Sequence, residues 1–330
     1  MKTNRLNVQF IAAVLALAAF ATGAGAQDTA ANYPNRPIRF VVPYPPGALT
    51  DVLARVIGDR LSAAVKQPVI VENRAGAGTL VGAELVAKAP ADGYTLLMAT
   101  STTLGISPAI YSKPQVDPVK DFAAVSLVGS VNFFLVASPR LGVKSVAELV
   151  DLAKNNPGKF NYASSGSGSP HHLFMEVFKK ETGIDVQHVP YKGSALAVFD
   201  VIAGKPEMMF LDFSVAVPNI QAGKVTALGT SAAVQSVLMP GVQPVARTVP
   251  GFDWQAWQGV VATAGTPRSI LAKLNAEMQR FQATPEFKEQ LVKFGMEPWV
   301  PNTPEQFGEI IKTDVGRWAT VVKAAGLKVD

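Results

Sequence analysis

Residues 38–61 read IRFVVPYPPGALTDVLARVIGDRL, and this stretch decides the fold. The apolar run at 38–42 predicts a buried strand, and the prolines and glycine of residues 43–47 break it. Apolar side chains then recur at helical spacing, which predicts an amphipathic helix. Thr50 suits the N-cap position of this helix and Asp51 its first turn, where a negative charge is favourable. The stretch is therefore a strand, a turn and a helix, which is the building block of an α/β fold.

The chain repeats this design in its second half. Residues 160–162 predict a short strand, residues 164–169 read SSGSGS, and residues 170–178 return to helical spacing. Pro170 suits the first helical position and Ser169 the cap before it. Elsewhere, short β-rich runs alternate with helical patterns, which is typical of βα units around a mostly parallel sheet. The chain has 330 residues, 48% of them hydrophobic and 17% charged, which suits about two such domains.

The two loops carry the strongest functional signal. Each joins the end of a strand to the start of a helix and is rich in glycine, proline or hydroxyl groups. Ligands of open α/β sheets bind at this edge, and amide groups at a helix start bind anions without a charged side chain. Ser101, Thr102 and Thr103 follow a third predicted strand and add hydroxyl donors. We therefore expect loops 43–51 and 164–172 to face each other and bind a carboxylate, although either loop alone also suits a purely structural turn.

Few other side chains suggest chemistry. His171 and His172 are adjacent, so they lie on different faces of a helix and do not form a metal pair; His172 is expected to cap or line the second loop. Asp212 ends a predicted strand, where it accepts a hydrogen bond from a ligand or forms a turn. Phosphate-loop, dinucleotide and nucleophile-elbow patterns do not occur at either loop. Ser165 and Ser167 lack a positioned base, so we expect no catalytic residue, no cofactor and no metal.

The N-terminus has the order of a secretory signal peptide. Lys2 and Arg5 precede an apolar run, and the small residues AGA follow at 24–26. The run is shorter than the ~20 residues of a membrane-spanning helix, so we interpret residues 1–26 as a signal peptide cleaved near Ala26. The chain has no cysteine, which excludes disulfides and thiol chemistry. Its net charge of +5 is dispersed, which argues against nucleic-acid binding.

A series of ordered motifs also runs from Tyr33 to the C-terminal part of the chain. The motifs are YPNRPI (33–38), VPYPPG (42–47) with Thr50 and Asp51, VENRAGAG (71–78), DGY (92–94), YASSG (162–166), SP (169–170), HL (172–173), HVPYKG (188–193), AGK (222–224), WQG (257–259) and AGTP (264–267). In this order they resemble the periplasmic solute receptors of tripartite tricarboxylate transporters, often called Bug receptors. The family usually has Gly-Ala where this chain has Ala48-Leu49, and Pro where it has Thr263.

The resemblance implies an α/β architecture, the two-lobed type II periplasmic binding-protein fold, in which each lobe is a mostly parallel sheet flanked by helices. Crossovers near Gly129 and Asp253 would divide the chain into lobe 1 (27–128 plus 253–330) and lobe 2 (129–252). In this family the first loop holds the ligand carboxylate and the second contributes from the other lobe. Carried over, the resemblance points to Tyr44, Gly47, Thr50, Ser165, Gly166, Ser169 and His172, with Asp212 at a variable specificity position. Ala48, Leu49 and Ser101 complete the predicted ligand-binding set.

The resemblance further implies a monomeric, non-enzymatic periplasmic receptor that delivers a small carboxylate to integral membrane transporter subunits. A ligand-loaded sensor that signals through a membrane kinase would use the same closed lobes, and the sequence does not separate the two roles. A hydrolase that uses Ser165 or Ser167 is the third hypothesis. The family takes di- and tricarboxylates, acidic amino acids and aromatic acids, and Leu49 and Phe213 are compatible with a partly apolar acid.

Overall fold

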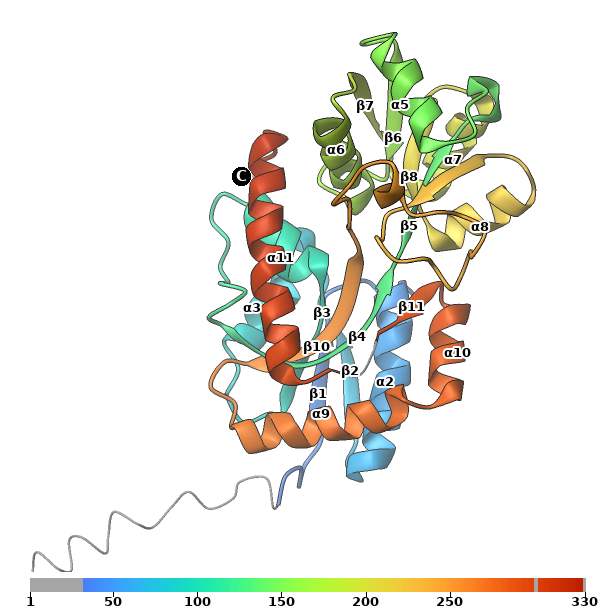
Figure 1. Cartoon of the computed structure of the whole chain (residues 1–330). Coiled ribbons are helices and arrows are strands. Elements are labelled where there is room, and N and C mark those ends of the chain that lie inside the picture. The colour runs from blue at the N-terminus through green and yellow to red at the C-terminus, as the bar shows by residue number, and fades with distance from the viewer. Residues whose placement is uncertain (1–31, 300–301, 329–330) are drawn as a thin grey trace, which may run out of the picture.

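The computed structural model describes residues 32–299 and 302–328 and contains two β-sheets, each with its own helices (Figure 1). The predicted signal peptide (1–26) lies outside the described residues. The lower sheet in Figure 1 has the strand order β11-β4-β10-β3-β1-β2. Its strands are β1 (Ile38–Val42), β2 (Val69–Asn73), β3 (Thr95–Thr100), β4 (Phe122–Val131), β10 (Ala256–Thr263) and β11 (Met296–Pro298). Its helical segments are α2 (Leu49–Val65), η1 (Ala77–Thr79), α3 (Leu80–Ala87), η2 (Thr102–Ile106), α4 (Ser107–Ile110), α9 (Arg268–Gln282), α10 (Pro285–Lys293) and α11 (Pro304–Ala324).

The upper sheet has the order β7-β6-β8-β5-β9. Its strands are β5 (Phe133–Ala137), β6 (Phe160–Ser164), β7 (Val186–Pro190), β8 (Met208–Asp212) and β9 (Thr226–Thr230). Its helical segments are η3 (Pro139–Leu141), α5 (Val146–Lys154), α6 (Pro170–Thr182), α7 (Ser194–Ala203), α8 (Phe213–Gln221) and η4 (Val245–Arg247). None of the helices in the described part of the chain has the length and apolar character needed to cross a membrane.

Both sheets are mixed. In the lower sheet β1 pairs parallel with β2 and β3, whereas β10 runs antiparallel to β3 and β4, and β11 antiparallel to β4. In the upper sheet β6 pairs parallel with β7 and β8, and β5 is antiparallel to β8 and β9. Most strands of each sheet therefore run in one direction, and β5, β10 and β11 run against them. The α/β class expected from the sequence is confirmed.

The chain passes between the two sheets twice. β4 stays paired with β10 up to Val131, and β5 begins at Phe133, so the first passage lies at Asn132. Gly129 still pairs with β10 and β11 in the lower sheet. The second passage follows β9 and ends where β10 begins at Ala256.

This connection turns the carboxyl edges of the two sheets toward each other. β4 leaves the lower sheet at the edge where β1 and β3 also end, and it continues directly into β5. Phe133, the first residue of β5, pairs with Asp212, the last residue of β8. β6 runs parallel to β8, so its last residue lies on the same edge. The loops that follow β1 and β6 therefore lie on facing edges, where open α/β sheets bind ligands.

Helices cover both faces of the lower sheet. In β1, Phe40 packs into an apolar cluster with Leu53 of α2, whereas its neighbour Val41 packs on the other face with Phe307 of α11. All four of these side chains are fully buried. Burial of such a side chain contributes about 1.5–3 kcal/mol, so the strand end that carries the first loop is held firmly.

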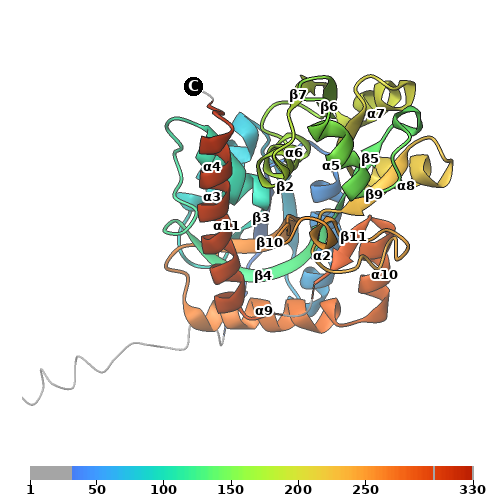
Figure 2. The ribbon, with the colours of Figure 1, turned by 45° about the horizontal axis from the view of Figure 1, so that its top comes forward.

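The last helix, α11, joins the two lobes. Its Trp318 is buried, stacks on Phe174 of α6 at 5.9 Å between ring centroids, and lies 4.7 Å from Trp254 near the second passage. Val322 of α11 belongs to the same apolar cluster, which otherwise consists mainly of residues of the upper lobe. Figures 1 and 2 show α11 extending along one side of the molecule from the lower lobe toward α6.

Candidate ligand-binding site

The first loop ends in a helix start that has no polar cap residue. α2 begins at Leu49, and its N-cap is Ala48, whose methyl side chain cannot accept a hydrogen bond. The sequence prediction that Thr50 caps this helix is therefore wrong. The amide of Ala48 donates to the carbonyl of Pro45, which starts the helical turn earlier than the pattern indicated. The amide groups of the first turn still need acceptors, and an anion at this position would supply them.

Asp51 holds the shape of this loop. Its buried carboxylate accepts hydrogen bonds from the amide of Gly47 (2.8 Å), the side chain of Asn73 (2.8 Å) and Arg55 (2.9 Å). Asn73 also donates to the carbonyl oxygen of Tyr44 (3.1 Å). Burial alone would raise the pKa of Asp51, but the hydrogen bonds from Arg55, Gly47 and Asn73 outweigh it and lower the pKa. From the sequence, Asp51 was expected to favour the helix dipole, and no local pattern indicated its contact with Asn73.

The hydroxyl-rich segment after β3 joins the first loop. The hydroxyl of Tyr44 lies 3.1 Å from the Oγ1 of Thr100, which lies 3.0 Å from the Oγ1 of Thr103. Burial raises the pKa of Tyr44, so its phenol stays protonated and can donate. The buried Oγ of Ser101 finds no hydrogen-bond partner within residues 32–299 and 302–328. A buried hydroxyl without a partner is costly, which makes Ser101 a candidate contact for a ligand.

The second loop closes on itself. Ser169 is the N-cap of α6, as predicted, and accepts from the amide of His172 (3.4 Å) while donating to the carbonyl of Gly166 (2.6 Å). The amide of Gly168 donates to Nδ1 of His172 (3.0 Å). Gly166 has φ 131° and Gly168 φ 77°, conformations that favour glycine. The loop is thereby held in one shape before any ligand arrives.

The ring of His172 supports the second loop. Its ring stacks on His188 at 3.8 Å, with Tyr162 beside both rings. Burial, and next the neighbouring His188, lower the pKa of His172 to about 4. The neutral ring can therefore accept the hydrogen bond from Gly168. This arrangement agrees with the expectation that His172 caps or lines the loop, and its contact with a ligand stays a prediction.

A hydrogen-bonded chain links Ser165, His171 and Asp212. The Oγ of Ser165 lies 2.8 Å from Nδ1 of His171, and Nε2 of His171 lies 3.0 Å from Oδ1 of Asp212. The second carboxylate oxygen of Asp212 accepts from Ser214 (2.6 Å). Burial alone would raise the pKa of Asp212, but the hydrogen bond from His171 outweighs it and holds the pKa far below its usual range. The expectation that Ser165 has no base beside it is therefore wrong, because the pattern did not reveal the position of His171.

Two contacts bring the lobes together beside these loops. Gly168 of the second loop packs so closely on Ile110 of α4 that a Cβ would lie 2.8 Å from its side chain. Phe213, which follows Asp212, packs against Gly295 of the lower lobe in the same way. The lower edge thus presents Tyr44, Gly47, Ala48, Leu49, Thr50 and Ser101, and the upper edge presents Ser165, Gly166, Ser169, His172 and Asp212.

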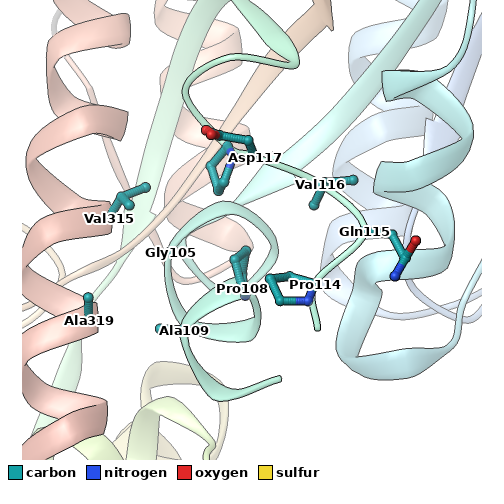
Figure 3. A pocket seen from close by; sticks show the side chains of 10 residues that line it. Gly105, Pro108, Ala109, Pro114, Gln115, Val116, Asp117, Val315 and Ala319 are labelled. Atoms are coloured by element: carbon teal, nitrogen blue, oxygen red, sulfur yellow. The ribbon is translucent and has the colours of Figure 1, made fainter. Parts of the chain in front are cut away.

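Two cavities elsewhere are poorly suited to an anion. One of about 510 Å³ lies between α4, α11 and residues 114–118, with mostly apolar walls (Figure 3). Its one charged residue is Asp117, which accepts hydrogen bonds from two backbone amides. The other, of about 290 Å³, contains the acids Asp253, Glu309 and Asp314, and its Arg317 already stacks on a tryptophan ring. The first lining offers no positive charge, and in the second the three acids outnumber the single arginine, so neither suits a carboxylate.

Solved structures define the class of the protein. The Rhodopseudomonas palustris protein Rpa4515, solved with adipate, is 32% identical, covers 90% of this chain and 99% of its own, and gives a TM-score of 0.75. MatC from the same species, solved with bound malate, is 31% identical over 88% of this chain and 100% of its own, with a TM-score of 0.71. The periplasmic binding protein BugD is 29% identical over 90% and 99%, with a TM-score of 0.71. Two mixed sheets with facing loops are thus a periplasmic binding-protein fold.

The sequence places the chain within this class. Residues 53–327 match the tripartite tricarboxylate transporter family receptor, TctC, and the chain belongs to that family. This is a family of solute receptors and is not catalytic. The contact between Ser165, His171 and Asp212 is therefore not a catalytic triad. The resemblance inferred from the motifs is confirmed.

Proposed function

We propose that this protein is a periplasmic receptor that captures a small carboxylate between the loops after β1 and β6. It then delivers the ligand to the membrane subunits of a tripartite tricarboxylate-type transporter. The main support for this proposal is the start of α2, where the N-cap is an alanine and the first-turn amides lack a polar cap residue. The signal-peptide pattern at 1–26 supports export to the periplasm.

Electrostatics favour an anion at the start of α2. The positive end of the helix dipole lies there, and Arg55 offsets the negative charge of Asp51 at 2.9 Å. Closing of the lobes would remove water from the site, and hydrogen bonds to a charged ligand are stronger there. Closure is then a population shift that the ligand drives through contacts made only in the closed state.

A dicarboxylate fits this site better than an aromatic acid. Leu49 is half-buried and packs against the core of the lower lobe, and Phe213 packs on Gly295 and lies 6.3 Å from the ring of Phe134. Both apolar side chains that suggested an aromatic ligand are thus engaged within the protein. Two family relatives were solved with dicarboxylates, adipate and malate, which supports the same choice.

A sensing role is the second candidate. A closed, loaded receptor that docks on a membrane kinase would use the same two lobes. Deletion of the gene separates them. Loss of carboxylate uptake supports transport, whereas normal uptake with lost transcriptional induction supports sensing.

A ligand screen with matched variants tests the binding function. Thermal shift and calorimetry with adipate, malate, citrate and benzoate should identify a ligand, because a molecule that binds only the folded state raises its melting temperature. The double variant Thr50→Ala, Ser169→Ala should bind that ligand about 5- to 150-fold more weakly, since each lost hydrogen bond costs about 0.5–1.5 kcal/mol. Ser145→Ala is the matched control, because Ser145 caps α5 in the same way, far from the loops.

Two outcomes would contradict the proposal. One is the absence of a thermal shift with every carboxylate of the panel. The other is a double variant whose affinity equals that of the Ser145→Ala control, because the loss of one helix cap would then account for every effect.

A further inference from the structure

Gln258 of β10 has a buried amide oxygen without a hydrogen-bond partner. The residue is only 5% exposed, and within residues 32–299 and 302–328 its Oε1 meets no donor. An acceptor that is removed from water and bonds to nothing is costly, and buried side-chain oxygens are normally paired. The oxygen of Gln258 therefore needs a hydrogen donor that the described part of the chain does not supply.

Strand register places Gln258 beside the first loop. It pairs with Thr100, the last residue of β3, and cross-strand partners present their side chains on the same face of a sheet. The hydroxyl of Thr100 lies 3.1 Å from that of Tyr44 in the first loop. Two positions along β10, Val260 shares an apolar cluster with Leu53 of α2, and alternate residues of a strand share a face. Gln258 therefore lies on the α2 face, at the sheet edge where α2 begins.

Two further buried groups at the same edge have an atom without a partner. One is the hydroxyl of Ser101, directly after β3, and the other is Oδ1 of Asn132, at the first passage between the lobes. Nδ2 of Asn132 donates to Glu297 (3.1 Å), which leaves its oxygen as an acceptor. A hydroxyl donates or accepts, whereas an amide oxygen only accepts. Besides the amide donors at the start of α2, this edge therefore offers acceptors that a carboxylate alone does not satisfy.

Resting on the proposed function, we propose that Gln258 is a specificity-determining residue that binds a hydroxyl group next to the carboxylate held at the start of α2. The hydroxyl donates its hydrogen to Oε1, and Nε2 donates to the adjacent carboxylate oxygen. A 2-hydroxy acid carries these two groups on neighbouring carbons, so it matches both ends of the amide. An unsubstituted dicarboxylate has no donor and leaves Oε1 unpaired. An ammonium group is a donor too, but the positive end of the α2 dipole disfavours it.

Pairs of acids that differ in a single hydroxyl test the proposal by calorimetry. Malate is compared with succinate, and citrate with tricarballylate. The hydroxylated acid of a pair should bind about 5- to 150-fold more tightly, because its partner leaves a buried acceptor unpaired. Aspartate, which has an ammonium where malate has its hydroxyl, should bind more weakly than malate. These comparisons use the wild-type protein, so they decide the question even where a substitution prevents folding.

A substitution with a matched control assigns the effect to Gln258. Gln258→Met keeps the length of the side chain and removes both amide groups, so the affinity for malate should fall to that for succinate, which should not change. A merely structural effect would weaken both acids and keep their ratio. Gln282→Met is the control, because Gln282 of α9 is also buried, with an unpartnered Oε1 and a hydrogen bond to Ser126 (3.1 Å). It should keep the wild-type ratio.

Several results would overturn the role of Gln258 and leave the receptor function standing. Equal wild-type affinities within the pairs would mean that a water molecule satisfies Oε1. A ratio that survives in Gln258→Met would mean that another group binds the hydroxyl, and tighter binding of aspartate than of malate would contradict the choice of a hydroxyl. Binding of adipate or benzoate but of no hydroxylated acid would overturn the role too. Failure of every carboxylate to bind would instead overturn the receptor function.

Discussion

Asp314 should make the protein lose stability as the pH rises from 4 to 6. Its carboxylate is buried at the junction of the lobes, and its Oδ2 accepts from the indole groups of Trp257 (2.8 Å) and Trp318 (3.0 Å). Burial raises the pKa of Asp314 to about 6. The two indole hydrogen bonds and the charge of Arg317 lower it by smaller amounts. The perturbation is Asp314→Asn, which keeps an oxygen acceptor and removes the titrating charge.

The magnitude follows from the pKa difference. The folded protein binds the proton of Asp314 more tightly than the unfolded chain does, because the ordinary pKa of an aspartate is 3.8. The stabilisation is therefore complete below pH 4 and is lost as the pH rises through 6. A shift of about two units at 1.36 kcal/mol per unit amounts to about 3 kcal/mol.

Urea unfolding of both proteins between pH 4 and 8 measures this difference. The free energy of unfolding of Asp314→Asn, minus that of the wild type, should rise by about 2 kcal/mol between pH 4 and 6 and level off above about pH 7. Other titrating groups cancel in the difference. A difference that stays constant over the whole pH range would refute the reasoning.

Three further substitutions test other parts of the structure. Asp51→Asn weakens the hydrogen bond from Gly47, so it should lower the unfolding free energy by about 2 kcal/mol and weaken adipate binding. An unchanged calorimetric affinity for adipate would contradict the role of Asp51 in shaping the first loop. Gly168→Ala puts a Cβ 2.8 Å from the side chain of Ile110, so the affinity for adipate should fall. A second substitution, Ile110→Ala, should partly restore that affinity, and a double variant that shows no restoration would argue against the interlobe contact. Trp318→Ala should cost about 3–5 kcal/mol in urea unfolding, and a loss below about 1 kcal/mol would be inconsistent with its burial.

The sequence predicted the elements that local patterns control. The strand at Ile38–Val42 is formed as expected, because four of its five residues are apolar and β-favouring and Pro43 follows at once. Ser169 and Pro170 begin α6 as predicted, because both act on the backbone within a few residues. Thr50 was the exception, since Ala48 already occupies the N-cap position through the turn made with Pro45.

The sequence could not predict contacts between residues that are far apart in the chain. Asn73 reaches the first loop only because β2 pairs with β1 in a particular register. His171 meets Asp212 because β6 and β8 are neighbours in the sheet, although the two residues are 41 positions apart. Periodicity describes which face of a helix or strand is buried, but it does not give the order of strands in a sheet. For that reason the loops and the cap Ser169 were predicted, whereas the contacts of Asn73 and His171 were not.

A crystal structure of the complex with adipate or malate tests the central claim most directly. We expect one carboxylate within hydrogen-bond distance of the amides of Leu49 and Thr50, with Ser165 and Ser169 approaching from the other lobe. A ligand bound instead in the apolar cavity beside Pro108, or held mainly by lysine or arginine side chains, would contradict the account.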